Sequence, residues 1–113
     1  MKILLVDDSN LNNRLTERLV KQLGHTSVVC NDPEMALDVL QNDPQIKIVI
    51  SDMYMPGLTG LQLLEEVRRL PKFQGANALF IPPFVLLTSS TDKKLGEQAE
   101  KAGFVRVIQK PLS

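Results

Sequence analysis

The sequence predicts an α/β fold in which helices cover both faces of a parallel β-sheet. Five short apolar runs alternate along the chain with stretches whose apolar residues recur at helical spacing, which is typical of such sheets. The apolar runs are continuous, as expected of strands buried on both faces. The 113 residues suffice for one domain with a hydrophobic core. We therefore expect a single domain over residues 1–113.

The first strand and helix are expected close to the N-terminus. Residues 3–6, Ile-Leu-Leu-Val, indicate a buried strand, and Ser9 is suited to cap the helix that follows. Gly24 suits the position just beyond the end of that helix. Leucine recurs at every fourth position, which we interpret as one apolar helix face. These leucines are Leu11, Leu15, Leu19 and Leu23.

The second helix has clear start and stop signals. It follows a short second strand at residues 26–30 and begins at Asp32-Pro33, a cap with proline in the first helical turn. Asp43-Pro44 ends it. The third strand, residues 46–50, follows.

The third strand runs into a carboxylate, Asp52. Met55-Pro56-Gly57 then makes a stiff turn, because proline restricts φ and glycine tolerates a positive φ. A third helix is expected after Thr59-Gly60. A carboxylate at the C-terminal edge of a core strand lies where open α/β sheets place their chemistry.

The second half of the chain holds the last two strands. Residues 71–83 form a long connection with an apolar stretch, Leu79-Phe80-Ile81, near its end. The fourth strand is expected at residues 84–87, and Thr91-Asp92 can cap a fourth helix. The fifth strand is expected at residues 105–108.

The strand ends supply a set of polar side chains. We expect the flavodoxin-like strand order 2-1-3-4-5, whose switch point lies between the first and third strands. These two strands end in Asp7-Asp8 and Asp52, and the fourth and fifth end in Thr88 and Lys110. The order therefore brings carboxylates, a hydroxyl and an ammonium to one crevice.

Three neighbouring carboxylates need a compensating charge. One pair at about 4 Å costs about 4 kcal/mol at an effective dielectric constant of 20. Oxygen ligands favour a hard divalent cation such as Mg²⁺, and Lys110 adds a fixed positive charge. A cation, a lysine and the Thr88 hydroxyl together can stabilise a transferring phosphoryl group. We interpret Asp52 as the nucleophile that forms an aspartyl-phosphate.

Composition excludes several other classes of protein. The 13 basic and 13 acidic residues balance, so this domain has no basic excess for direct contact with nucleic acid. The single cysteine, Cys30, cannot form an internal disulfide, which fits a reducing, cytoplasmic location. No apolar run approaches the ~20 residues of a transmembrane helix, so we expect no membrane contact.

Taken together, these residues resemble a response-regulator receiver domain of two-component, His-Asp phosphorelay signalling. The matching residues span nearly the whole chain: Asp7-Asp8, Asp52 with Met55-Pro56 and Gly60, Thr88, and Lys110-Pro111. The opening Leu-Val-Asp-Asp-Ser-Asn, followed by Asn-Arg, resembles receivers attached to hybrid histidine kinases.

The resemblance implies a role for each residue. Asp52 would accept a phosphoryl group from a histidine kinase or a His-containing phosphotransfer protein. Asp8 would ligate Mg²⁺ directly and Asp7 mainly through water, with Asp52 and the Tyr54 carbonyl completing the protein ligands. The remaining two side chains, Thr88 and Lys110, would bind the phosphoryl oxygens.

The sequence departs from the family pattern at several places. Val107 stands where the family usually has a switching tyrosine or phenylalanine, and Ser89 replaces the usual alanine while remaining small enough to leave the phosphoryl site open. The connection at residues 71–83 is longer than usual. The sequence stops at Ser113, where the family would begin its fifth helix.

Two other functions compete with a phosphoacceptor switch. A pseudo-receiver would keep the fold and bind partners without phosphorylation, which Val107 and the missing last helix favour. A Mg²⁺-dependent phosphatase of the haloacid-dehalogenase type would need Asp-x-Asp after its first strand, whereas Asp7 and Asp8 are adjacent. We therefore expect a regulatory domain whose only chemistry is its own phosphorylation and dephosphorylation, rather than an enzyme.

The missing last helix has a consequence for assembly. The first and fifth helices normally share one face of such a sheet, so here only the first helix would cover it. We expect an exposed apolar strip beside Val105 and Val107, through which the chain forms a homodimer unless it is part of a longer protein. The Leu79-Phe80-Ile81 stretch is a weaker candidate to cover this strip.

Overall fold

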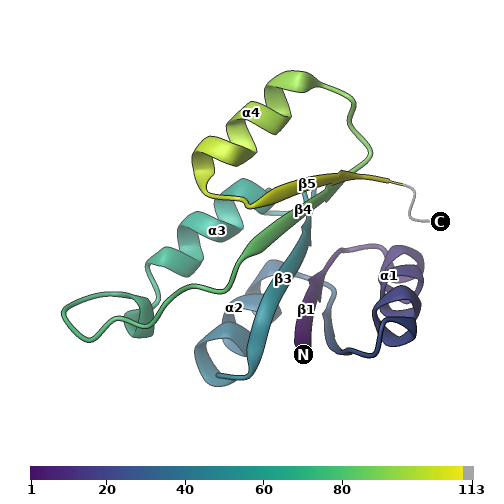
Figure 1. The fold of residues 1–113 in the computed structure, drawn as a ribbon. Helices are drawn as coiled ribbons and strands as arrows, with labels where there is room; N and C mark the ends of the chain where they lie inside the picture. The colour runs from purple at the N-terminus through teal and green to yellow at the C-terminus, as the bar shows by residue number, and fades with distance from the viewer. Residues whose placement is uncertain (111–113) are drawn as a thin grey trace.

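The computed structural model describes residues 1–110 and has the predicted architecture, a five-stranded parallel sheet with helices on both faces (Figure 1). Pro111 lies outside the described residues. The strands are β1 (Lys2–Val6), β2 (Thr26–Cys30), β3 (Ile46–Asp52), β4 (Phe84–Thr88) and β5 (Arg106–Gln109). Four α-helices connect them: α1 (Asn10–Gln22), α2 (Pro33–Asn42), α3 (Gly60–Arg68) and α4 (Lys93–Ala102). Strand order is β2-β1-β3-β4-β5, which confirms the flavodoxin-like prediction.

The helix starts follow from side-chain caps. Ser9 and Asp32, both predicted caps, accept hydrogen bonds from backbone N–H groups in the first turns of α1 and α2. Thr59 and Gln62 form a reciprocal capping box at α3. Asp92 caps α4, which ends at Gly103 with a φ of 108°, a conformation that glycine adopts without strain.

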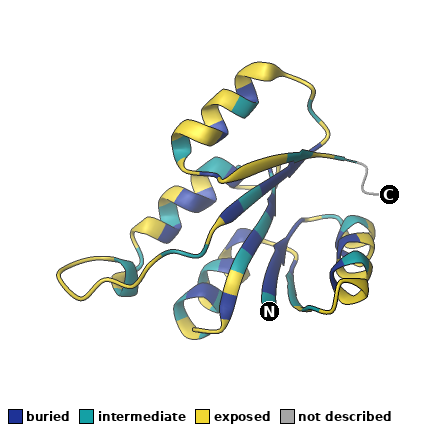
Figure 2. Ribbon diagram, in the orientation of Figure 1, coloured by how far each residue is buried: buried dark blue, intermediate teal, exposed yellow. Residues whose placement is uncertain are grey.

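The main hydrophobic core lies between the sheet and helices α2, α3 and α4. Alternate strand residues point into it, among them Leu4, Val49 and Phe84, and all three are almost fully buried. Figure 2 shows much of β1 and β4 in the dark blue of buried residues. Phe84 and Phe104 meet edge to face with ring centroids 5.8 Å apart. A smaller cluster, with Ile3 and Leu5 at its centre, lies on the α1 face.

The prediction that the leucines of α1 form its buried face is wrong. Leu11, Leu15 and Leu23 are 67%, 40% and 75% exposed, and the buried residues of the helix are Asn13, Thr16 and Val20. An α-helix has 3.6 residues per turn, so leucines four residues apart drift by about 40° at each step and by about 120° from the first to the fourth. The leucines therefore spiral around the helix instead of lining one face.

The α1 face of the sheet is only partly covered, as expected. The apolar residues left exposed on it are not the predicted Val105 and Val107. Val107 pairs in register with buried Leu86, and together with Val105 it lines a groove beside α4, on the opposite face. The half-buried apolar residues on the α1 side include Ile48 and Ile50. Among residues 1–110, no helix follows β5 to cover them.

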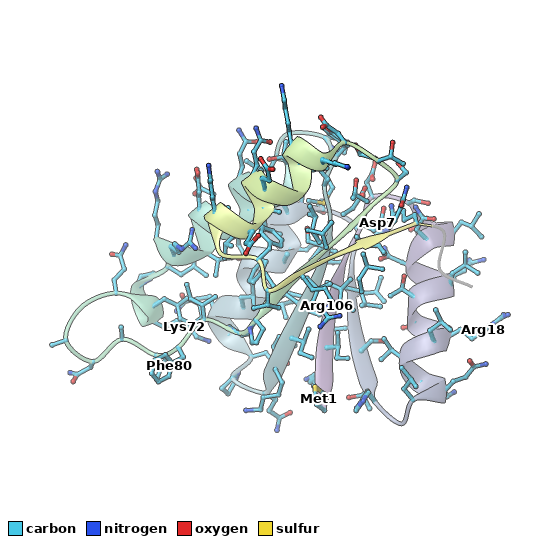
Figure 3. The ribbon with its side chains drawn as sticks, turned by 45° about the horizontal axis from the view of Figure 1, so that its top comes forward. Met1, Asp7, Arg18, Lys72, Phe80 and Arg106 are labelled. Carbon is cyan, nitrogen blue, oxygen red and sulfur yellow. The ribbon has the colours of Figure 1, made fainter. Side chains whose placement is uncertain are left out.

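The connection between α3 and β4 is attached to α2 and to the main core. It opens with a 3₁₀ turn at Pro71–Phe73. The ammonium of Lys72 donates hydrogen bonds to the carbonyls of Leu40 and Gln41 at the C-terminal end of α2. Ile81 packs against the main core. Leu79 is 57% exposed and Phe80 fully exposed at the projecting loop, so this stretch does not cover the sheet (Figure 3).

A second contact ties α3 to α4. The guanidinium of Arg68, the last residue of α3, donates to the carbonyl of Ala102 at the C-terminal end of α4. A cation at this position also opposes the partial negative charge of the helix end. The C-terminal end of α4 is thereby attached to the neighbouring helix.

Gly60 makes the closest backbone approach behind the third strand. A Cβ atom there would lie 2.6 Å from the Asp52 carbonyl oxygen and 2.9 Å from Leu86 Cδ1. The Gly60 N–H donates to the Met53 carbonyl across 2.7 Å. A glycine is therefore needed for α3 to start against the end of β3.

We predict that Gly60→Ala lowers the free energy of unfolding by about 1–3 kcal/mol, the usual cost of overpacking. The matched control is Gly96→Ala within α4, where an added Cβ meets nothing within 4 Å. That change should be neutral or stabilising by up to about 1 kcal/mol, because alanine has the higher helix propensity. Urea unfolding of both variants measures the difference, and equal stabilities would contradict the close-approach argument.

Candidate functional site

Four strands bring their C-terminal ends to one edge of the sheet. Asp7 and Asp8 follow β1, Asp52 ends β3, Thr88 ends β4 and Lys110 follows β5. Figure 3 shows Asp7 at this edge, far from Met1 and Phe80. The structure thus places the strand ends that the sequence analysis selected at one edge of the sheet.

The three carboxylates form one cluster. Oxygen atoms of Asp7, Asp8 and Asp52 all lie within 4.8 Å of one another. Asp7 is 4% exposed, Asp52 is half-buried and Asp8 is exposed. The cluster therefore has a buried floor and one carboxylate that faces solvent.

Lys110 bridges the two buried members of the cluster. Its Nζ donates to Asp7 Oδ2 across 3.0 Å and to Asp52 Oδ1 across 3.1 Å. Its backbone N–H is held by the Thr88 carbonyl at 2.7 Å, which continues the β4–β5 pairing. Burial opposes the charged ammonium, but the hydrogen bonds to Asp7 and Asp52 outweigh it and raise the pKa of Lys110.

Asp52 is the carboxylate most affected by its surroundings. Burial raises its pKa, and the charge of Asp7 raises it further, while the hydrogen bonds from Lys110 and from the Met53 N–H partly compensate. The net direction is upward. The ionised form of Asp52 is therefore less favourable here than in an unfolded chain.

The charge and the donor atoms of the cluster fit a hard divalent cation. Three carboxylates and one ammonium leave two negative charges when all are ionised, and the available donors are oxygens. Burial and the charge of Asp7 both raise the pKa of Asp52, so a cation bound beside it would favour its ionised form. The residues present are thus suited to Mg²⁺.

The three remaining predicted residues, Thr88, Ser89 and Tyr54, lie at or just after the ends of β4 and β3. Thr88 is buried, and its Oγ1 accepts the Ser90 N–H across 3.1 Å, a bond that leaves the hydroxyl proton for another acceptor. Ser89 is exposed. Tyr54 has an exposed side chain, and its backbone forms an antiparallel bridge to Thr59 that closes the turn after β3.

Two polar residues next to the cluster escaped the sequence analysis. The hydroxyl of fully buried Ser51 donates to the Asp52 carbonyl, and the amide of buried Asn13 donates to the Asp7 carbonyl. Asn13 was overlooked because the leucines of α1 predicted a different buried face of the helix. The signal that could have found it is the polar-polar-apolar set at positions 13, 16 and 20, which does share one helix face.

Comparison with known families identifies the domain. A family model for the response regulator receiver domain matches residues 3–113, nearly the whole chain. The chain belongs to this family. Such domains are regulatory components of two-component systems, as the sequence predicts.

Individual relatives include both stand-alone and multidomain proteins. A chemotaxis protein CheY homolog of Campylobacter jejuni is 32% identical over 114 residues, which cover all of this receiver and 83% of that protein. The sensory/regulatory protein RpfC of Xanthomonas campestris is 27% identical over 112 residues, which cover 99% of this receiver and 15% of RpfC. The solved structure of CheY4 from Vibrio cholerae shares the fold with a TM-score of 0.83 and 24% identity, covering 99% of this receiver and 88% of that chain.

The helices of this receiver are short. Within residues 1–110, none is long and apolar enough to cross a lipid bilayer.

We predict that Asp52→Asn stabilises the metal-free receiver at neutral pH. Because the folded state raises the pKa of Asp52 above its ordinary 3.8, the unfolded state loses this proton first as the pH rises. The free energy of unfolding therefore falls as the pH rises from the ordinary to the raised pKa, and it stays lower at any higher pH. Asparagine keeps the acceptor oxygen without the charge, so the variant lacks this fall.

Urea unfolding in EDTA across pH 3 to 8 measures the effect. The excess stability of Asp52→Asn should be largest near neutral pH. It should vanish as the pH falls to the ordinary carboxyl pKa of 3.8. Asp92→Asn, an exposed cap outside the cluster, is the control. A variant less stable than wild type at every pH would show that the hydrogen bond from Lys110 outweighs the cost of burial and the repulsion from Asp7.

Proposed function

We propose that this receiver is a phosphoacceptor switch in which Asp52 takes a phosphoryl group from a phosphohistidine donor. The observation that carries the proposal is the Asp52 carboxylate itself. It is half-buried at a strand end, shares the Lys110 ammonium with Asp7 and lies within 4.8 Å of the Asp8 oxygens. Clustered carboxylates with a perturbed pKa beside a lysine are typical of functional sites.

The hydrogen bonds to Asp52 suggest which oxygen reacts. Lys110 and the Met53 N–H both donate to Oδ1. Within residues 1–110 no hydrogen bond engages Oδ2, so we assign Oδ2 as the attacking atom. It would form a bond to phosphorus while the phosphorus–nitrogen bond of the donor breaks, and the electron pair would leave with the imidazole.

The surrounding groups would stabilise the transferring phosphoryl group. Mg²⁺, held by Asp7, Asp8, Asp52 and the Tyr54 carbonyl, would supply positive charge to its oxygens. Lys110 can contact the same oxygens by shifting from the carboxylates, and the Thr88 hydroxyl has a proton to donate. Ser89 is small and exposed, which leaves access to the site.

We infer a histidine kinase or a His-containing phosphotransfer protein as the donor, acting in the cytoplasm. The similarity to RpfC and to the sensor histidine kinase AruS of Pseudomonas aeruginosa supports this class of partner. The receiver would control an output by its conformation, with no chemistry beyond its own phosphorylation and hydrolysis.

A pseudo-receiver is the second candidate, and one observation favours it. Val107 lies beside α4, is 37% exposed and is too small to follow the movement that an aromatic side chain makes in the family. The intact cluster of Asp7, Asp8 and Asp52 with Lys110 favours phosphorylation instead.

Intact-mass measurement with acetyl phosphate and Mg²⁺ tests the choice between the two. We predict one added phosphoryl group on the wild type, which hydroxylamine removes, and none on Asp52→Asn. Asp92→Asn should be phosphorylated like wild type because its carboxylate caps α4 away from the cluster. A wild type that remains unmodified by acetyl phosphate and by phosphohistidine donors would support the pseudo-receiver.

We predict that Lys110→Ala slows phosphorylation by roughly 100-fold, the usual effect of removing one group that stabilises transition-state charge. Lys101→Ala, in the last turn of α4, should change the rate less than about twofold because this lysine faces solvent. Rates are compared at saturating Mg²⁺ with both variants shown to be folded by circular dichroism. Equal rates in Lys110→Ala and wild type would remove Lys110 from the mechanism.

A further inference from the structure

We propose that Asn13 is a positioning residue for the Asp7-Asp8 pair, whose buried amide fixes the peptide that presents Asp8 to a divalent cation. This inference rests on the metal site of the proposed function. It concerns a residue of α1 that belongs to none of the ligands assigned above.

The contact is direct and buried. Asn13 is 3% exposed, and its Nδ2 donates to the main-chain carbonyl of Asp7 across 2.8 Å. A buried amide costs free energy unless it is hydrogen-bonded, and an aliphatic residue at this helix position would pack without that cost. The side chain of Asn13 instead joins α1 to the turn that follows β1.

Asp7 itself is held from several directions. Its N–H donates to the Cys30 carbonyl at the end of β2. Its Oδ1 accepts the Ser9 N–H across 2.9 Å, and its Oδ2 accepts Lys110. Its carbonyl oxygen, bound by Asn13, belongs to the peptide that leads into Asp8, so this bond sets the direction in which the chain leaves Asp7.

Asp8 depends on its neighbours for its position. It is exposed, and within residues 1–110 no hydrogen bond engages its backbone or its carboxylate. The bonds that bracket it are Asn13 to the Asp7 carbonyl and the Ser9 N–H to Asp7 Oδ1. Removing the Asn13 amide frees the Asp7–Asp8 peptide to rotate, and Asp8 then loses its fixed distance to the other two carboxylates.

Thr16 provides a matched control. It lies on the same buried face of α1 and is 6% exposed, but its hydroxyl donates to the Asn12 carbonyl of its own helix. It therefore has the burial and polarity of Asn13 without the bond to Asp7.

The experiment compares Mg²⁺ affinity in Asn13→Leu and Thr16→Val, each close in shape to the original and without its donor. Amide shifts of Asp8 and Ser9 are followed by NMR during Mg²⁺ titration, at a temperature where urea unfolding shows both variants fully folded. We expect Asn13→Leu to weaken Mg²⁺ binding by about tenfold, as outer-sphere ligand supports commonly do. Thr16→Val should stay within about twofold of wild type. Asn13→Ala replaces the leucine variant if that one does not fold.

Mg²⁺ binding is also measured for Asp8→Ala and for the wild type, as controls for the metal site itself. Loss of binding in Asp8→Ala beside wild-type affinity in Asn13→Leu would overturn the inference and leave the metal site standing. Equal weakening in Thr16→Val would also overturn it, because the effect would then be a general one of α1 packing. A wild type that binds no Mg²⁺ would overturn both the inference and the metal site.

Discussion

The site depends on the two salt bridges that the Lys110 ammonium forms with Asp7 and Asp52. These carboxylates belong to strands on either side of the switch point, and the lysine comes from the far end of the chain. At an effective dielectric constant of 20, two like charges 4 Å apart repel by about 4 kcal/mol. The ammonium offsets part of this repulsion, and the two negative charges left over suit a hard cation.

The hydrophobic core beneath the site offsets this electrostatic repulsion. The main core, centred on Leu4, Val49 and Phe84, is almost fully buried and holds the strand ends in place irrespective of the charges above them. Gly60 lets α3 begin against the Asp52 carbonyl, so the third strand cannot shift without moving that helix. A stable scaffold under an unfavourable charge cluster is common where binding or catalysis requires preorganised groups.

The strands and the residues at their ends could be predicted from the sequence, because continuous aliphatic runs and turn residues are local signals. The strand order was expected only as the common arrangement of such sheets, and the structure confirms it. The orientation of α1 could not. Its leucines suggested one buried face, whereas contacts with the sheet select Asn13, Thr16 and Val20. The bond between Asn13 and the Asp7 carbonyl depends on that orientation. The helical spacing of positions 13, 16 and 20 is present in the sequence, but the more apolar leucines outweigh it until the contacts with the sheet are known.

The attachment of Arg68 to the Ala102 carbonyl has a mechanical consequence for α4. The amino end of this helix follows the loop after Thr88 and is held by the Asp92 cap, whereas its carboxyl end is joined to α3. A displacement of the loop after Thr88 would therefore reach α4 at its amino end, while the carboxyl end stays attached to α3. Such a displacement would rotate the helix about its carboxyl end, with the largest movement in the first turn and the smallest beside Gly103.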